Sequence, residues 1–407
     1  MNNILEVTYQ QTQKSVTTNE YGMREMQARV YEKYASQYLL VKAPPASGKS
    51  RALMFVALEK LRQKQVKKVI VAVPERSIGS SFSSKNLTAN GFHTDWNINR
   101  MYDLCAPGDE KLTRIPFDAF FTDENAEVLV CTHAALLMAY GRHGISVFND
   151  FLIGIDEFHH VSCDADSKLG DFLRKLIRQT NAHVLAMTGS YFRGDCNAVV
   201  SPSDERNFEK VTYNYYEQLN GYKHLKSLGI GFHFYTGAYT SALMNDEVLD
   251  LNKKTIIYIP NVNSIELSDK YMAVDKILAC IGEYQFTDEN GIYHLKGRNG
   301  REMIVADLVN DKGEEGINRN KAMLYLRQIE HPEQMDIIIA LQMAKEGFDW
   351  PYCETTLTIG YRGALTEIVQ IIGRCTRDSD NKTHAQFTNL VAEPNANREE
   401  IVDSVNN

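Results

Sequence analysis

The segment VKAPPASGKSRALM, from Val41 to Met54, contains residues whose types and spacing could bind phosphate. Ala43 to Ser50 fits the phosphate-loop pattern, with alanine in the first glycine position and Gly-Lys-Ser at the end. Such loops aim backbone N–H groups at phosphate oxygens, while the lysine reaches the β- and γ-phosphates and the last hydroxyl binds Mg²⁺. We therefore expect a nucleoside triphosphate site whose contacts are Ala46, Ser47, Gly48, Lys49 and Ser50.

Two prolines, Pro44 and Pro45, lie in the leading half of this loop and lack the N–H group that binds phosphate. The donors that matter come from Ser47 to Ser50, where the apolar periodicity predicts that a helix begins. The free N–H groups and the dipole of a helix N-terminus favour negative charge. The prolines are therefore compatible with the site, and their fixed φ angles reduce the freedom lost on binding.

The apolar run FLIGI ends in two adjacent acids, Asp156 and Glu157. A carboxylate at a strand end can hold Mg²⁺, usually through water, and its neighbour can orient and deprotonate an attacking water. We expect Asp156 to bind the metal and Glu157 to act as the general base. A short acidic turn is the alternative, which the phosphate loop upstream disfavours. A further cluster downstream matches no usual zinc-ligand spacing: His159, His160, Cys163, Asp164 and Asp166.

The segment TEIVQIIGRCTRD combines polar residues with the apolar spacing of a helix. Gln370, Arg374 and Arg377 stand three or four positions apart, so a helix could present them on one face. Arginines held together suit multidentate contact with phosphate and neutralisation of charge in a transition state. A solvated basic helix face is the alternative, and the companion motifs favour the phosphate role.

Buried parallel strands separated by helix-length segments must position these residues. Apolar, β-branched runs predict strands at 38–44, 67–74, 127–133, 151–157 and 183–190, and again at 253–260, 302–309, 335–342 and 354–360. We therefore expect an α/β fold of two tandem domains with parallel sheets, residues 1–207 and 208–407. Asn290 and Gly291 predict a β-hairpin inserted in the second domain, projecting with a basic tip that contains Lys296, Arg298 and Arg301.

The composition limits the class of protein. The 407 residues are 43% hydrophobic and carry a net charge of -8, which argues against a protein that coats nucleic acid but permits a local basic groove. The seven cysteines stand singly, as is typical of free thiols in a reducing cytosol. The N-terminus lacks a basic and then apolar leader, and no apolar run approaches a membrane span. We expect a soluble, cytoplasmic protein.

The motifs, taken in order, resemble those of superfamily 2 DExH helicases and translocases, within the DEAD/DEAH box helicases. GMREMQAR resembles the adenine-reading motif, APPASGKS motif I, AVPERSI motif Ia and VCTHAALL motif Ib. DEFH resembles motif II, TGS motif III, IYIPNV motif IV, AKEGFDWP motif V and QIIGRCTR motif VI. The EGFDWP and DEFHH forms are most similar to the helicase parts of type III restriction enzymes and related defence or repair translocases.

This resemblance implies two RecA-like P-loop domains with ATP in the cleft between them and a nucleic-acid strand crossing both. Lys49 and Ser50 would bind phosphate and Mg²⁺, and Asp156 would hold the metal beside the general base Glu157. The remaining roles that the resemblance implies are adenine recognition by Arg24 and Gln27, arginine fingers at Arg374 and Arg377, nucleotide sensing by Gln370 and His159, coupling through Thr188 and Ser190, a link from ATP to the strand through Gly347 and Asp349, and backbone-phosphate contacts from Arg76, Thr132 and Asn261.

The implied function is ATP-dependent movement on, or unwinding of, nucleic acid, with DNA favoured over RNA. Two alternatives stay open: an ATP-gated clamp or remodeller without unwinding, and an ATPase that acts on proteins. The chain ends about thirty residues after motif VI, so we expect a fragment, a minimal motor or a subunit. A protein partner would then supply substrate specificity, with no role for a membrane.

Overall fold

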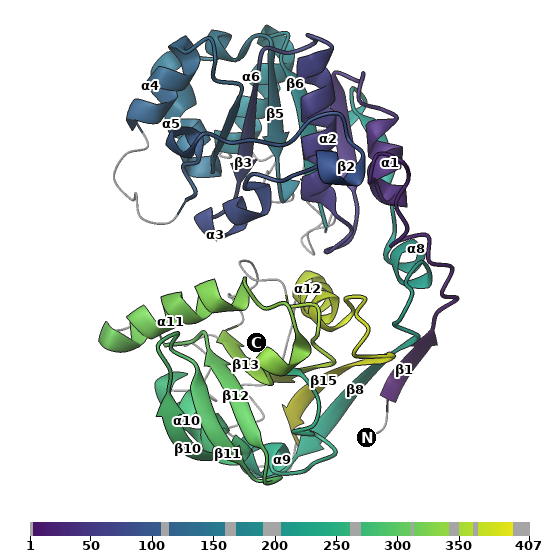
Figure 1. Ribbon diagram of the computed structural model, residues 1–407, viewed down its shortest axis with the longest axis vertical. Coiled ribbons are helices and arrows are strands. Elements are labelled where there is room, and N and C mark those ends of the chain that lie inside the picture. Colours follow the sequence, from purple (N-terminus) through teal and green to yellow (C-terminus); the bar gives the residue numbers. More distant parts are fainter. Residues whose placement is uncertain are drawn as a thin grey trace. The chain divides into compact units, whose positions relative to one another are not determined.

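The computed structural model describes residues 3–106, 114–158, 168–189, 205–260, 270–310, 313–341, 350–360 and 365–393. The chain forms two compact units, whose elements are labelled in Figure 1. The first unit is Thr12–Gly221, and the second combines Met1–Gln11 with Tyr222–Asn407. The N-terminal segment therefore folds with the second unit. No helix among the described residues has the length and apolar character needed to span a bilayer.

The first unit is built on a six-stranded sheet in the order β4-β3-β5-β6-β2-β7, and every pair within it is parallel. Its strands are β2 (Tyr38–Lys42), β3 (Lys68–Val73), β4 (Val128–Thr132), β5 (Phe151–Ile155), β6 (His183–Thr188) and β7 (Glu209–Thr212). Its helices are α1 (Glu25–Tyr31), α2 (Lys49–Arg62), α3 (Arg76–Gly79), α4 (Arg114–Thr122), α5 (His133–His143), α6 (Lys168–Gln179) and α8 (Tyr215–Asn220). The five strands expected from apolar runs in this half of the chain are confirmed.

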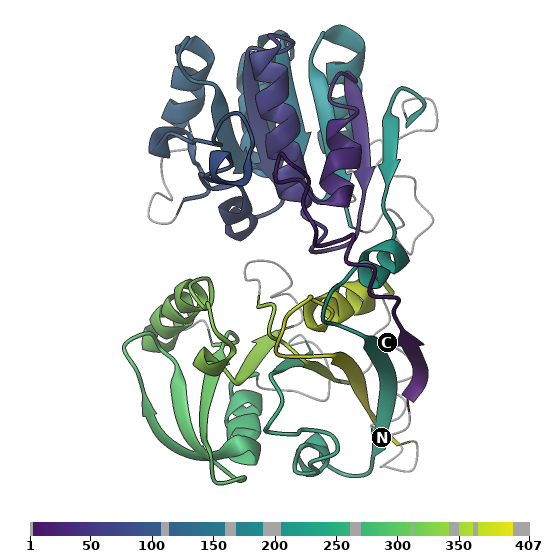
Figure 2. The ribbon, with the colours of Figure 1, turned by 45° about the vertical axis from the view of Figure 1, so that its right-hand side comes forward.

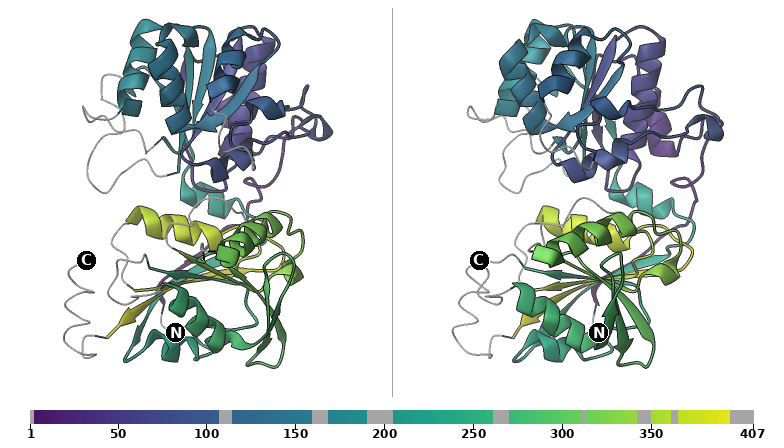
Figure 3. Two further views of the ribbon diagram at one scale, coloured as in Figure 1. Left: turned by 90° about the vertical axis from the view of Figure 1, so that its left-hand side faces the viewer. Right: turned by 60° about the vertical axis from the view of Figure 1, so that its left-hand side comes forward.

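Two apolar cores lie on the two faces of this sheet, because successive side chains of a strand point in opposite directions. Val69 and Val71 of β3 belong to a core that includes the buried apolar residues of α1 and α2. Their neighbours Ile70 and Ala72 belong to a second core with α4, α5 and α6. Helices therefore cover both faces of the sheet, as Figure 3 shows. This double cover explains why the strands are continuously apolar.

The edge strand β7 was not expected from the sequence, since its EKVT residues are mostly exposed and carry no apolar run. Its hydrogen-bonded neighbour is β2, with Val41 opposite Val211 and Lys42 opposite Thr212. The first unit therefore continues through β7 and α8 to Gly221.

The second unit has a nine-stranded sheet in the order β1-β8-β15-β14-β9-β13-β12-β11-β10. Its strands are β1 (Asn3–Thr8), β8 (Ser227–Tyr235), β9 (Thr255–Ile259), β10 (Gly282–Thr287), β11 (Tyr293–Gly297), β12 (Glu302–Asp307), β13 (Ile337–Leu341), β14 (Thr355–Ile359) and β15 (His384–Ala392). The six neighbouring strands β8, β15, β14, β9, β13 and β12 are parallel. At the two edges the pairing is antiparallel, between β1 and β8 and between β12, β11 and β10. Figure 2 shows β1 beside β8 at one edge. The helices are α9 (Tyr239–Leu243), α10 (Lys270–Ile281), α11 (Gly313–Leu326) and α12 (Leu365–Cys375).

The hairpin around Asn290 and Gly291 is confirmed as β10 and β11, with Gly291 in the left-handed region at φ 73°. The expectation of a projecting basic tip is wrong, because β10 and β11 extend the sheet as its edge. Arg298 lies in the opposite turn, between β11 and β12, and donates to the carbonyl oxygens of Cys280 and Leu249 at 2.6 Å each. Its guanidinium group anchors α10 to the sheet.

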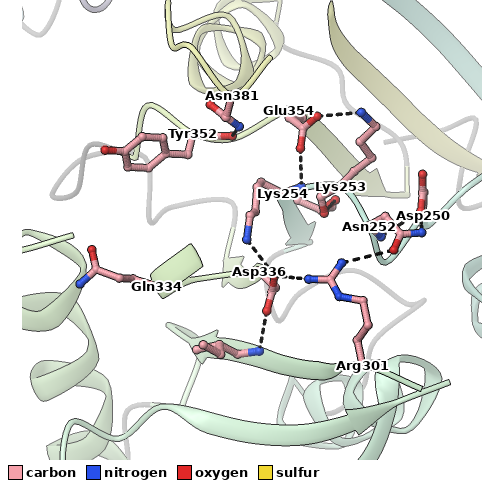
Figure 4. A network of polar contacts seen from close by, with 12 residues as sticks. Asp250, Asn252, Lys253, Lys254, Arg301, Gln334, Asp336, Tyr352, Glu354 and Asn381 are labelled. Carbon is pink, nitrogen blue, oxygen red and sulfur yellow. Dashed lines mark hydrogen bonds and ion pairs between the residues drawn. The ribbon is translucent and has the colours of Figure 1, made fainter. Parts of the chain in front are cut away.

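A polar network joins the starts of the central strands of the second unit (Figure 4). Asp336, before β13, forms an ion pair with Lys254 at 2.8 Å and accepts a hydrogen bond from the N–H of Ile304 at 2.9 Å. Glu354, before β14, accepts from Lys253 at 2.8 Å and from the N–H of Lys254 at 3.0 Å. The network pairs buried carboxylates and sets the register at the amino ends of the parallel strands.

Candidate nucleotide-binding site

The loop after β2 turns sharply into α2 through two residues in the left-handed backbone region. Ala46 has φ 65° and Gly48, the N-cap of α2, has φ 89°. A Cβ atom on Gly48 would lie 2.3 Å from Nε2 of Gln27, so only glycine fits here. The first turn of α2 contains no acidic residue, and no side chain caps it. Its free N–H groups are therefore suited to an anion.

The trailing half of the loop is hydrogen-bonded to the leading half through the carbonyl of Pro44. Ser47 donates to this oxygen from its hydroxyl at 2.8 Å and from its N–H at 3.3 Å. Lys49, which is only 8% exposed, donates from Nζ to the carbonyls of Ala43 and Pro44 at 3.0 Å each. The prolines give up donors, and Pro44 contributes an acceptor that organises the loop.

The expected adenine-reading residues lie next to this loop. Gln27 of α1 is 3% exposed; its Nε2 donates to the carbonyl of Gly48 at 3.2 Å and its Oε1 accepts from the N–H of Arg24 at 2.8 Å. Arg24 itself is exposed at the N-cap of α1. Burial, and then the charge of Arg24, lower the pKa of Arg51, which directly follows Ser50. Sequence analysis missed Arg51, which adds a second guanidinium beside the loop.

The two acids after β5 lie at the same edge of the sheet, because β6 pairs with both β5 and β2. Asp156 is buried, and its Oδ1 accepts from the N–H of Glu157 at 3.0 Å. Glu157 has φ 47°, a strained conformation for a residue with a Cβ atom that is characteristic of functional turns. Nε2 of His133 lies 3.1 Å from the carbonyl oxygen of Asp156, which can only accept, so Nε2 carries the proton. His133 fixes the turn and was not expected from its sequence.

The end of β6 completes this edge of the sheet. Thr188 is fully buried, and its carbonyl accepts from the N–H of Ala43 at 3.1 Å. A Cβ atom on the next residue, Gly189, would lie 3.4 Å from Nζ of Lys49 and 3.5 Å from Cδ of Pro45. The structure therefore brings the ends of β2 and β6 together around Lys49.

The expected nucleic-acid contacts of the first unit follow two neighbouring strands, β3 and β4, whose last residues Val73 and Thr132 are paired in register. Oγ1 of Thr132 accepts from the N–H of Ala135 at 3.2 Å and caps α5. Arg76 is partly buried and donates to the carbonyl of Ala106 at 3.1 Å. The edge that carries the phosphate loop thus also carries these two residues.

In the second unit, Gln370 and Arg374 lie on α12, which ends at Cys375. Arg377 follows the helix, so the expectation that all three share one helical face is wrong. The helix ends before Arg377 because the buried Lys382 caps it: its Nζ donates to the last helical carbonyl, that of Cys375, at 2.9 Å. The same Nζ also donates to the carbonyl of Pro351 at 2.8 Å and to that of Cys353. Burial lowers the pKa of Lys382. The sequence contains no local signal for this cap.

Several expected site residues lie outside the described residues: His159, Ser190, Asn261, Gly347 and Asp349. The disfavoured zinc cluster, His159 to Asp166, lies outside them too. Among the described residues, no group of three or more His, Cys, Asp or Glu side chains could hold a metal ion. The oxygens of Ser50 and Asp156 nevertheless suit Mg²⁺, which takes its other ligands from phosphates and water. The site therefore fits a metal that arrives with its nucleotide.

Comparison with known proteins agrees with this geometry. The sequence pattern of the family described as "DEAD/DEAH box helicase" matches residues 24–195, which contain Lys49 and Asp156. The whole chain is 56% identical over 409 residues to "Putative ATP-dependent helicase YeeB" of Bacillus subtilis (strain 168), of which it covers 67%. The chain belongs to the DEAD/DEAH box helicases. Membership in this helicase family implies that ATP is bound and hydrolysed.

Solved helicase structures share the fold of this DEAD/DEAH box protein. The helicase MrfA bound to DNA matches with a TM-score of 0.61 and 12% identity, over 96% of this chain and 48% of MrfA. Dbp5 of S. cerevisiae bound to RNA and ADP BeF3 matches with a TM-score of 0.54 and 14% identity, over 94% of this chain and 86% of Dbp5. The chain therefore spans about half the length of MrfA. The fold is that of two tandem RecA-like domains, with a hairpin inserted in the second.

Proposed function

We propose that this DEAD/DEAH box helicase hydrolyses ATP to move along, or unwind, DNA. The observation that carries the proposal is the gathering of Lys49, Gly48 in its left-handed conformation, and Thr188 at the carboxyl edge of the first sheet. Asp156 and Glu157 follow β5 at that same edge. MrfA and the Mycobacterium smegmatis helicase Lhr were solved bound to DNA and Dbp5 was solved bound to RNA, and the proposal takes DNA as the favoured strand.

The residues of the first unit divide the chemistry among them. Lys49 exchanges its bonds to Ala43 and Pro44 for phosphate oxygens, and the N–H groups from Ala46 to Ser50 contact the same phosphates. Ser50 and Asp156 would hold Mg²⁺, which would supply positive charge to the phosphates when bound. Glu157 orients and deprotonates the attacking water. Arg24 and Gln27 recognise the base, and Arg51 adds positive charge beside them.

The second unit supplies positively charged side chains whose contact with the nucleotide changes during hydrolysis. Arg374 and Arg377 contact the γ-phosphate in the closed state, with Gln370 as a sensor, and release it after hydrolysis. Thr188 and Ser190 with His159, and Gly347 with Asp349, link this step to the strand. Arg76, Thr132 and Asn261 hold backbone phosphates, so few contacts are needed and an acidic chain can bind nucleic acid.

Two finer assignments extend the proposal. The EGFDWP and DEFHH segments support a motor that serves a restriction or defence complex in the cytoplasm, with a partner that supplies specificity. An ATP-gated clamp or remodeller is the alternative, because the site requires closure of the two units on the strand but not strand separation.

The deciding experiment measures ATP hydrolysis by the full chain without polymer, and with single-stranded DNA, duplex DNA and RNA in parallel. We expect DNA to raise turnover at least several-fold, and the Lys49→Ala variant to show no stimulated turnover. A fluorescent strand-displacement assay under the same conditions separates a helicase from a clamp. Turnover that no polymer stimulates would refute the motor.

A further inference from the structure

The helix α8 lies beside the phosphate loop because of how the sheet is ordered. Strand β7 pairs in parallel with β2, so the residues after both strands leave the same edge of the sheet. The N–H of Tyr213, which follows β7, donates to the carbonyl of Lys42 at 2.8 Å. The chain then enters α8, which is labelled in Figure 1.

One side chain of α8 contacts the loop directly. Gln218 is 3% exposed, and its Nε2 donates to the carbonyl oxygen of Pro45 at 3.1 Å. Burying an amide at this depth is costly unless it is hydrogen-bonded, so the contact is a specific one. Gln27 holds the other end of the same loop through Gly48. Two buried glutamines from separate helices therefore fix the loop at its leading and trailing halves.

The backbone of α8 is itself held firmly. Asn214 and Glu217 form a capping box with bonds of 2.8 Å in both directions, and Glu217 forms an ion pair with Arg29 at 2.9 Å. The hydroxyl of Ser15 donates to the carbonyl of Gln218 at 2.8 Å and lies 2.6 Å from the hydroxyl of Tyr213. The helix can therefore shift only together with the segment around Ser15.

That segment is one of the two places where the chain passes from one unit to the other. The passages are Gln11 to Thr12 and Gly221 to Tyr222. The N–H of Thr12 donates to the carbonyl of Asn220 at 2.8 Å, and the N–H of Ser15 donates to that of Gly221 at 2.9 Å. A Cβ atom on Gly221 would lie 1.9 Å from Oγ of Ser15, so the two passages are packed without space between them. The first passage is hydrogen-bonded to the last turn of α8, and the second passage directly follows that turn.

We propose that Gln218 is a positioning residue that couples the phosphate loop to these two chain passages. The inference rests on the proposed function, since it requires that nucleotide reorganises the loop. When Lys49 leaves the carbonyls of Ala43 and Pro44 for phosphate, Pro45 moves with them. The bond from Gln218 carries that movement to α8, and so to both passages at once.

Hydrogen exchange of the full chain, with and without a non-hydrolysable ATP analogue and Mg²⁺, tests the coupling directly. In the unmodified protein, we expect the analogue to slow exchange in residues 43–52 and also in 213–221. In Gln218→Glu, which keeps the side-chain volume but has no N–H to donate, protection of 43–52 should remain and that of 213–221 should be lost. The expected loss of analogue affinity is about fivefold, as for one net hydrogen bond.

The matched control is Gln37→Ala, because Nε2 of Gln37 also donates to a backbone carbonyl, that of Ala182 at 3.2 Å, at the opposite ends of β2 and β6. This variant should keep nucleotide protection in both segments and the unmodified ratio of DNA-stimulated to unstimulated turnover, which Gln218→Glu should lower. Equal protection of 213–221 in Gln218→Glu and the unmodified chain would overturn the coupling alone. Absence of protection at 43–52 in the unmodified chain would overturn the nucleotide site, and the coupling with it.

Discussion

The ammonium group of Lys49 donates a hydrogen bond to the carbonyl oxygen of Pro44 at 3.0 Å. This bond joins the residue that should bind phosphate to the half of the loop that cannot supply N–H donors. The same carbonyl oxygen accepts hydrogen bonds from the hydroxyl and from the N–H of Ser47. The doubled proline therefore forms the acceptor side of the loop, and the helix N-terminus forms its donor side.

Replacing Lys49 by alanine should abolish hydrolysis, with a loss in turnover of at least about a hundredfold, because the principal countercharge for the phosphates is removed. Steady-state release of phosphate measures the effect. Lys68→Met is the matched control, since Lys68 also donates to two carbonyls, those of Asp123 and Ala126, but at the amino end of β3. Normal turnover in Lys49→Ala would contradict the phosphate site.

The variant Pro45→Gly should bind nucleotide more weakly by about fivefold or less, because the freed φ angle raises the entropy that the loop loses on binding. Titration with a fluorescent ATP analogue measures this affinity. Pro332→Gly, in the second unit, provides the control for a general effect of removing a proline. Tighter binding by Pro45→Gly would show that the proline restrains the loop in an unproductive shape.

The Glu157→Gln variant should bind ATP with unchanged affinity but hydrolyse it at least about a hundredfold more slowly, since an amide cannot take the proton of water. Single-turnover hydrolysis and a separate binding titration distinguish the two effects. Glu124→Gln changes the same charge at an exposed turn of the first unit and should do neither. Full activity in Glu157→Gln would exclude this residue as the base.

Replacing Arg377 by alanine should reduce turnover about a thousandfold, the usual contribution of an arginine finger, with little change in ATP affinity. The comparison of kcat with the dissociation constant tests this assignment. Arg301→Ala removes an arginine that precedes β12 and bonds to Asn252, and it should leave both values unchanged. If ATP affinity and turnover fell in proportion, Arg377 would instead contribute to binding ATP in the ground state.

Acid should destabilise the first unit through His183, whose Nδ1 lies 2.7 Å from Nζ of Lys60. Burial, and then the charge of Lys60, lower the pKa of His183 to about 4, below its usual value near 6.5. Between pH 4 and 6.5 the unfolded chain binds more protons than the folded chain. The free energy of unfolding therefore falls as the pH falls from 6.5 to 4. The contribution is about 2 kcal/mol after allowance for solvent screening.

The variant His183→Gln should flatten this pH dependence, because glutamine does not titrate and can still accept a hydrogen bond from Lys60. Thermal unfolding of the full chain at pH 6.5 and 4.5 provides the measurement. His233→Gln, on β8 of the second unit, should retain the unmodified slope. An equal slope in His183→Gln would assign the acid sensitivity to other groups.

The sequence by itself determined the central strands and the residues that follow them. Continuous apolar runs such as FLIGI are visible locally because both faces of a parallel sheet are covered. The start of α2 after Gly48 was also predictable, since its periodicity and its loop are local. Asp156 and Lys49 could be expected at one edge for the same reason, because parallel strands place their carboxyl ends together.

Tertiary structure alone decided the elements whose partners are distant in the chain. Strand β7 is polar and exposed and gains its place only by pairing with β2, while β1 joins the second unit only by pairing with β8. The end of α12 before Arg377 depends on the buried ammonium group of Lys382, and the contact of Gln218 with Pro45 spans 173 positions. Such contacts produce no periodic pattern in the sequence, because each depends on a partner that is distant in the chain and is brought close by the order of the strands.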